Sequence, residues 1–216
     1  MSEVQTAAKQ PTQLLGKKER RLLTDPFNDN NPITVQVLGI CSALAVTVAV
    51  KNALVMSIAV MVVTGFANLI ISLLRNTIPN RVRMIVQLVV IASLVSIVEM
   101  ILHAFQYDVY KQMSVYIGLI ITNCIIMGRL EAFAMANKPW QSLLDGIGNG
   151  VGYGAILVTV ALFREVFGKG TIMGYKVLPS WYEPNGLMLI PAAAIFLIGI
   201  IIWVQRAMNK KLVDIS

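Results

Sequence analysis

The sequence predicts an all-α membrane protein of six transmembrane helices, arranged as an inverted repeat of three helices plus three, with both termini in the cytoplasm. Three observations lead to this prediction: an apolar composition, six long apolar windows and an uneven placement of basic residues. Of the 216 residues, 56% are apolar and 13% are charged, and the mean hydropathy is +0.71. Soluble domains carry about 25% charged residues, so this composition excludes an ordinary water-soluble domain.

The apolar windows cover about half of the chain, and Glu99 is their only formally charged residue. Because about 20 apolar residues cross a hydrocarbon core of about 30 Å, each window is a candidate span, although some are short. The windows are residues 33–50, 53–74, 84–102, 113–128, 146–163 and 187–204. They divide the chain into an N-terminal arm (1–32), a six-helix membrane domain (33–204) and a C-terminal tail (205–216).

The basic residues predict the orientation of these spans. Most of the 18 Lys and Arg residues lie in the arm, after the second and fourth windows, and in the tail. The positive-inside rule therefore places both termini in the cytoplasm. The arm lacks the apolar run of a signal peptide, so we expect it to be retained. The net charge of +7 is then a topology signal, and we do not infer nucleic-acid binding from it.

The two halves, residues 33–102 and 113–204, contain similar residues at corresponding positions and in the same order. Cys41 and Cys124 fall in the first and fourth windows, while Arg75 and Arg164 follow the second and fifth. Because each half crosses the membrane three times, the halves must be inserted with opposite orientations, as in many transporters. As the echo of Arg75, Arg164 is predicted on the outer side, against the trend of the other basic residues.

The two cysteines are the main chemical clue. Helical geometry puts Cys41 about 12 Å and Cys124 about 14 Å from the inner edge of the bilayer. A common depth, with one cysteine in each half, is what a symmetric site requires. Two other interpretations stay open: that the thiols pack as small apolar side chains, or that they form a disulfide.

The residue inventory limits what such a site can bind. Thiolates select zinc, copper(I) or iron-sulfur clusters, and the common tetrahedral sites need four ligands. This chain supplies two, because its one histidine, His103, lies at the outer edge of a span. We therefore expect a partner to contribute the other ligands.

Two further features allow alternative interpretations. Gly146, Gly150 and Gly154 share one helical face, and Gly148 with Gly152 another, which predicts close helix contacts or a locally broken helix that lines a site. Glu99 lies near the end of its window, so an interfacial position is favoured over an ion pathway.

The loops hold other marked residues. Arg129 and Glu131 are expected to contact an inner-side partner or to mark the membrane boundary, and Tyr175, Trp181 and Tyr182 to form an outer aromatic belt. The sequence contains no hydrolase or P-loop motif.

These residues lie in segments that closely resemble the family of membrane proteins that contains the D subunit of the bacterial Na+-translocating NADH:quinone oxidoreductase and, more distantly, the E subunit of the Rnf complex. The resemblance begins at Asn31, runs to the end of the sixth window and leaves the first 30 residues without a family feature. Its most specific elements are Leu38-Gly39-Ile40-Cys41, Ile121 to Arg129, Glu131 to Ala134, Asp145 to Gly154 and Trp181 to Gly186.

The resemblance implies a membrane component of a Na+-transporting NADH:quinone reductase, in the bacterial inner membrane, without a complete active site of its own. It implies that Cys41 and Cys124 ligate a [2Fe-2S] cluster shared with a homologous E subunit. The A, B, C and F subunits complete such a complex, and other subunits bind its flavins and quinone. The alternatives are a component of an Rnf-type complex, a small inverted-repeat secondary transporter, and a scaffold protein whose cysteines only pack.

Overall fold

The computed structural model describes residues 23–24, 26, 30–79, 81–105, 107–172, 175–176 and 186–208. Helices joined by turns make up most of this part of the chain, and β1 (Thr171–Ile172) pairs antiparallel with β2 (Tyr175–Lys176) in a short hairpin. Most of the arm, the end of the tail, and Trp181 and Tyr182 of the expected aromatic belt lie outside the described residues.

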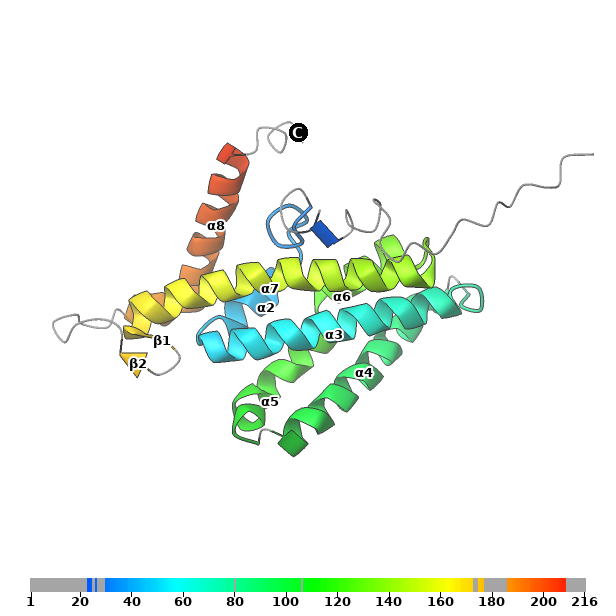
Figure 1. Ribbon diagram of the computed structural model, residues 1–216, viewed down its shortest axis with the longest axis horizontal. Helices are drawn as coiled ribbons and strands as arrows, with labels where there is room; N and C mark the ends of the chain where they lie inside the picture. The colour runs from blue at the N-terminus through cyan, green and yellow to red at the C-terminus, as the bar shows by residue number, and fades with distance from the viewer. Residues whose placement is uncertain are drawn as a thin grey trace, which may run out of the picture.

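Helices of very different lengths make up the membrane domain (Figure 1). Among the described residues, five helical segments are long and apolar enough to cross a membrane: α3, α4, the segment Tyr116–Ala134, α7 and α8. The prediction of an all-α membrane protein is confirmed. In chain order the elements are α2 (Ile40–Val46), α3 (Val50–Leu74), α4 (Arg83–Phe105), α5 (Tyr107–Ile121), α6 (Cys124–Arg129), the π-helical turn η2 (Leu130–Ala134), α7 (Pro139–Lys169), the 3-10 helix η3 (Gly186–Leu189) and α8 (Pro191–Met208).

The first apolar window does not form a continuous transmembrane helix. Residues 32–36 are turns and bends, and Val37 and Gly39 have left-handed backbone conformations with φ of 57° and 82°. Only the seven residues of α2 are helical before a second break at Thr47. Part of this window is buried inside the domain, with Ile33 and Ala43 fully buried, so an apolar window need not be one helix that spans the bilayer.

The fourth window is also interrupted. Its helix ends at Ile121, and α6 starts at Cys124 after a break at Thr122 and Asn123. The Asn123 side chain accepts a hydrogen bond from the Ile125 amide at 3.3 Å, so it caps the new helix. Side-chain capping therefore places this break inside a uniformly apolar stretch.

The long helices α3 and α7 lie side by side and antiparallel at the centre of the molecule (Figure 1). A Cβ added at Gly146 would lie 2.8 Å from the Thr64 carbonyl oxygen, and one at Gly150 would lie 2.7 Å from Met61 Cα. The glycine face thus lets two backbones approach closely, as the packing interpretation predicted. Helix α7 is continuous, so the broken-helix alternative is wrong.

The second glycine face meets the end of the N-terminal arm instead of another helix. A Cβ at Gly152 would lie 2.6 Å from the Pro26 carbonyl oxygen, and Asn31 donates a hydrogen bond to the Gly152 carbonyl at 3.3 Å. The described end of the arm therefore packs against α7.

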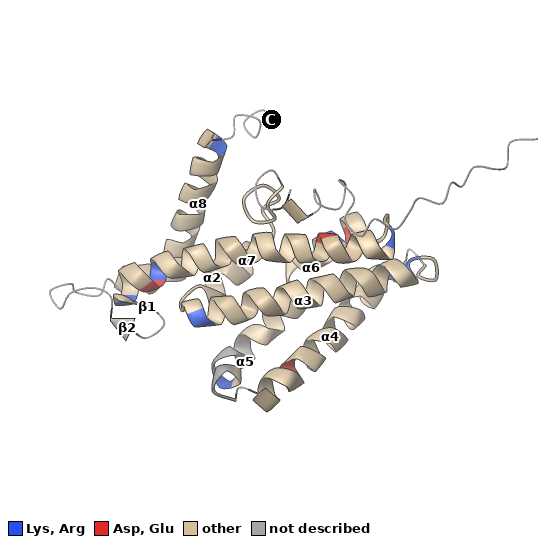
Figure 2. Ribbon diagram, viewed as in Figure 1, with Lys and Arg blue, Asp and Glu red and all other residues tan. Residues whose placement is uncertain are grey.

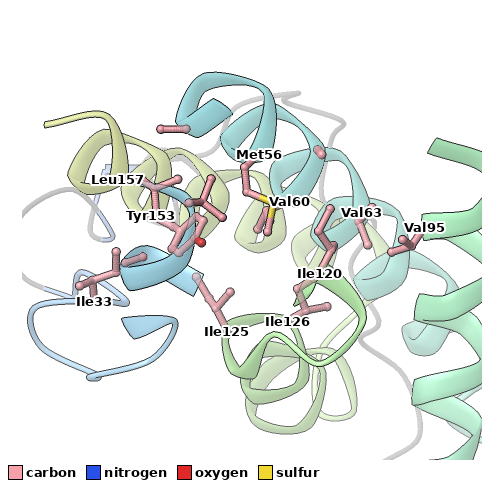
Figure 3. Packing of buried hydrophobic residues seen from close by; sticks show 14 of the residues in the cluster. Ile33, Met56, Val60, Val63, Val95, Ile120, Ile125, Ile126, Tyr153 and Leu157 are labelled. Atoms are coloured by element: carbon pink, nitrogen blue, oxygen red, sulfur yellow. The ribbon is translucent and has the colours of Figure 1, made fainter. Parts of the chain in front are cut away.

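The buried core follows the central pair of helices. Figure 3 shows Tyr153 and Leu157 of α7 in one cluster with Met56 and Val60 of α3. By contrast, only 17% of the apolar window of α4 and 11% of that of α8 is buried, against 56% for α3 and α7. Charged residues gather toward the helix ends (Figure 2). The outer helices therefore present apolar faces to lipid or to partner proteins.

Candidate metal centre

The structure brings the two cysteines together at the starts of two short helices. Cys41 is the second residue of α2, and Cys124 is the first residue of α6. The amide of Gly39, two residues before Cys41, lies 2.9 Å from the Cys124 sulfur, so the two cysteines lie near each other although they belong to different halves of the chain. Both are free thiols, so the disulfide alternative is wrong for this structure.

Gly39 provides a backbone donor to this pair. Its N–H donates to the Cys124 sulfur over 2.9 Å. The left-handed φ of 82° favours glycine at this position, and a Cβ here would lie 2.9 Å from Cε2 of the Tyr153 ring. Glycine thus allows the amide to reach the sulfur, and such N–H to sulfur bonds tune the potential of iron-sulfur clusters.

A buried polar network joins the cysteine helices to α7. The Ser42 and Tyr153 hydroxyls are 2.7 Å apart, and Asn123 Nδ2 donates to Ser42 Oγ at 3.3 Å. All three residues are fully buried, where unpaired polar groups are costly. The network therefore fixes the relative positions of α2, α6 and α7 beside the thiols.

The sequence alone did not identify Tyr153 as part of this site. There the residue was only one position within the segment Asp145 to Gly154. One signal was available: a tyrosine inside an apolar helix needs a hydrogen-bond partner for its hydroxyl.

The ligand set fits half of a four-cysteine cluster site. Among the residues that the structure describes, no group of three or more His, Cys, Asp or Glu side chains is placed to hold a metal ion. His103 lies at the end of α4, where its ring contacts those of Tyr107 and Tyr110. Cys41 is exposed and Cys124 is partly exposed, so both residues are accessible to a partner. Ligands from a second chain stay a prediction.

Two charged residues that we expected to contact a partner or mark the membrane boundary have partners within the chain. Arg129 Nε donates to Asp145 Oδ2 at 3.0 Å, and Asp145 is only 2% exposed. Glu131 forms a salt bridge with Arg83 and accepts a hydrogen bond from Gln87 at 3.3 Å. Both therefore link helices of the domain.

Glu99 accepts a hydrogen bond from the Tyr110 hydroxyl at 3.2 Å. The carboxylate raises the pKa of Tyr110, because its hydrogen bond stabilises the protonated hydroxyl and its negative charge repels the phenolate. This contact with the start of α5 joins the end of α4 to its neighbour.

Arg164 does not lie in an exposed loop. It is inside α7, fully buried, and hydrogen-bonded to backbone carbonyls from other elements. The positive-inside rule counts residues in loops, so it does not apply to Arg164, which is part of the core.

The sequence matches the family described as "Rnf-Nqr subunit, membrane protein" over residues 20–202. The chain belongs to this family. The match begins before Asn31, so the expectation that the first 30 residues lack any family feature is wrong for residues 20–30. Membership agrees with the described helices: the chain is a multi-pass membrane protein.

Three relatives of the chain are each the D subunit of a Na+-translocating NADH-quinone reductase. The protein from Photobacterium profundum is 56% identical over 203 residues, which cover 92% of this chain and 97% of the relative. That from Aeromonas hydrophila is 57% identical over 200 residues, covering 90% and 95%. That from Pseudomonas aeruginosa strain LESB58 is 56% identical over 200 residues, covering 90% and 89%. The chain thus groups with the D subunits, and the resemblance drawn from its motifs is confirmed.

Proposed function

We propose that the chain is the membrane component of a Na+-translocating NADH:quinone reductase that supplies half of a [2Fe-2S] cluster site, shared with a homologous E subunit. The observation that carries the proposal is the hydrogen bond from the Gly39 amide, two residues before Cys41, to the Cys124 sulfur, which brings two free and accessible thiols from different halves of the chain near each other. A bound cluster would supply one-electron transfer. Cys41 and Cys124 would hold it, together with two ligands from the partner.

The level of the thiols in the domain supports a role in moving electrons across the membrane. They lie beside Tyr153, near the middle of the 31-residue α7. A helix of this length is about 46 Å long, more than the hydrocarbon core of about 30 Å, so its middle falls near the bilayer centre. Because electron transfer weakens steeply with distance, a crossing of this size requires an intermediate stop.

The residues around the thiols have separate tasks in this proposal. Gly39 donates its N–H to the Cys124 sulfur, while the Tyr153 ring packs against Gly39 and holds that peptide in place. Ile125 and Ile126 are fully buried next to Cys124 and exclude water from its side of the site. Hydrogen bonding and apolar burial are the two means by which the chain would set the cluster's potential.

An inverted repeat with cytoplasmic termini is the topology that we propose for the domain. In this scheme α2 corresponds to α6, α3 to α7, and α4 to α8. Three features support this scheme. Helices α2 and α6 each begin after a non-helical segment and carry a cysteine in their first turn, and α3 and α7 are antiparallel. Arg75 and Arg164 each donate a hydrogen bond to a carbonyl of the other half. The six crossings are completed by the short elements α2 and α6 with their neighbouring segments.

The partners proposed for the chain are the E subunit at the cluster and the A, B, C and F subunits in the complete complex, which would bind the flavins and the quinone. The location is the bacterial inner membrane. In an assembly of this kind the chain has no complete active site, and NADH oxidation, quinone reduction and Na+ export belong to the complex.

Removing either thiol tests the proposal. In the purified complex, Cys41→Ala and Cys124→Ala are each expected to abolish the cluster spectrum of this site, reduce the iron content and stop quinone reduction, while the complex stays assembled. Ser93→Ala is the matched control, because Ser93 is an exposed residue of α4 far from the thiols in sequence. Iron content and spectra identical to the wild type in both cysteine variants would refute the proposal.

The secondary-transporter alternative loses one of its supports, because α7 is continuous through its glycines. Its decisive test is substrate flux by the chain alone in vesicles, unaffected by loss of the cysteines. The scaffold alternative is distinguished by an active complex without iron at this interface.

A further inference from the structure

Arg164 is a buried cation that uses all of its hydrogen-bonding capacity. It is 0% exposed, and a guanidinium has five N–H donors. Every acceptor is a neutral oxygen of another element. Nε donates to the Met188 carbonyl (3.1 Å), Nη1 to the Leu44 carbonyl (3.3 Å) and Thr47 Oγ1 (2.6 Å), and Nη2 to the Leu189 (2.9 Å) and Ile190 (3.2 Å) carbonyls.

These acceptors are the C-terminal ends of two short helices. Leu44 lies in the last turn of α2 and Thr47 is its C-cap, while the other carbonyls belong to the end of η3 and the residue after it. The last four carbonyls of a helix have no hydrogen-bond partner within the helix. In the seven-residue α2 these unpaired carbonyls make up more than half of the helix, so donors from other elements must satisfy them. One side chain of α7 therefore holds the C-terminal end of α2 and the start of α8 together.

The next residue of α7 holds the segment that follows α2. Glu165 accepts a hydrogen bond from the Val50 amide, the first residue of α3, at 2.7 Å. Arg164 and Glu165 thus form hydrogen bonds with both ends of the short connection between α2 and α3. The C-terminal end of the cysteine-bearing helix is consequently attached to the longest helix of the fold.

Apolar packing alone would have been a less costly way to join these helices. Transferring a charge into a membrane domain is unfavourable, and replacing buried charged groups by apolar side chains is often neutral or stabilising. A guanidinium differs from an apolar side chain in direction. Its planar donors bond two acceptors at the end of α2 and three carbonyls at the end of η3, so they specify one orientation of α2 relative to η3, whereas apolar contacts let α2 tilt or rotate.

We propose that Arg164 is a positioning residue for Cys41. This inference rests on the proposed function, because it takes Cys41 as a cluster ligand. Cys41 lies one helical turn before Leu44 on α2. Loss of the two bonds to Leu44 and Thr47 would leave α2 held by Gly39 and the Ser42 network near its start only, so Cys41 would lose its defined distance from Cys124.

Arg75 provides a comparison within the same molecule. Its Nη1 donates to the Asn137 carbonyl at 2.8 Å, and Ser72 Oγ donates to the same carbonyl at 2.7 Å. Asn137 follows η2, which continues the helix of Cys124. Arg75 is thus the counterpart of Arg164 on the other cysteine helix, with one bond in place of the two that Arg164 makes to α2, and its loss should have a smaller effect.

The test compares Arg164→Met, Arg164→Lys and Thr47→Val with Arg75→Gln in the purified complex. Two quantities are measured: hydrogen exchange of the α2 amides, and the part of the cluster spectrum that Cys41→Ala removes. Arg164→Met is expected to speed α2 exchange by about ten-fold or more, the size of one lost charged hydrogen bond, and to broaden or shift the spectrum. Arg164→Lys should restore part of both properties, because lysine keeps the charge and three donors.

Thr47→Val keeps the proposal testable if Arg164→Met does not assemble, since it removes a single bond, and it should speed α2 exchange less. Arg75→Gln should leave α2 exchange and the spectrum close to those of the wild type. Wild-type exchange and a wild-type spectrum in all the Arg164 and Thr47 variants would overturn the inference. A cluster spectrum unaffected by Cys41→Ala would instead refute the proposed function, and α2 exchange would still decide whether Arg164 holds the helix.

Discussion

At the scale of single residues, the site depends on a glycine beside a tyrosine. Gly39 combines a left-handed backbone with an N–H directed at the Cys124 sulfur, and the Tyr153 ring occupies the space where a side chain would extend. The cysteines were evident in the sequence as the only two thiols of the chain. The residues that orient them were not, because Gly39 and Tyr153 are distant in sequence and ordinary in an apolar helix.

Gly39→Ala should disturb the site without removing a ligand. A left-handed conformation costs a non-glycine residue roughly 1–2 kcal/mol, and the new Cβ would press on the Tyr153 ring. We expect a lower thermal unfolding midpoint and reduced iron retention in the purified complex. Gly199→Ala is the matched control, because nothing lies within 4 Å of a Cβ at that position. Equal iron retention in the two variants would contradict the role given to Gly39.

At the scale of helices, the central pair α3 and α7 supports the two short helices that carry the cysteines, α2 and α6. The spacing of its glycines could be read from the sequence, since residues four apart share a helical face. The breaks that create α2 and α6 could not be located in the same way. They lie in continuous apolar windows, and their positions depend on the Gly39 backbone and the Asn123 cap, which neighbouring elements stabilise.

Gly150→Ala should destabilise this helix pair. Its Cβ would lie 2.7 Å from Met61 Cα, so the two backbones must separate, and overpacking of this kind costs about 1–3 kcal/mol. We expect a lower unfolding midpoint of the purified complex. Gly118→Ala on α5 has open space around it and should leave the midpoint unchanged. The same midpoint for both variants would show that α3 and α7 tolerate a wider separation.

At the scale of the whole molecule, the domain exposes apolar surface along two of its outer helices, α4 and α8. Helices α4 and α8 bury little of their apolar surface, and Cys41 is exposed, so lipid and partner proteins must cover them. The apolar composition predicts such exposed apolar surfaces, but it does not indicate which helices carry them. Only the fold separates the buried central pair from the exposed outer helices, which have similar hydropathy.

Thiol labelling can test this exposure. In membranes that contain the chain without its partners, Cys41 should react with a membrane-permeant maleimide faster than Cys124, because it is exposed and Cys124 is only partly so. In the complete complex both thiols should be protected. The extent of labelling at each residue is read by mass spectrometry of the peptides. Faster labelling of Cys124, or labelling of Cys41 that the complex does not reduce, would be inconsistent with a ligand pair at an interface with a partner.

The sequence by itself determined the membrane class, the family, the cysteine pair and the packing face of α7, because each depends on residue type or on spacing along one helix. Tertiary structure decided the breaks before Cys41 and Cys124, the network around Tyr153 and the burial of Arg164. Those features depend on groups far apart in the chain: helix ends that lack partners within their own helix are satisfied by donors and acceptors that only the folded domain brings near.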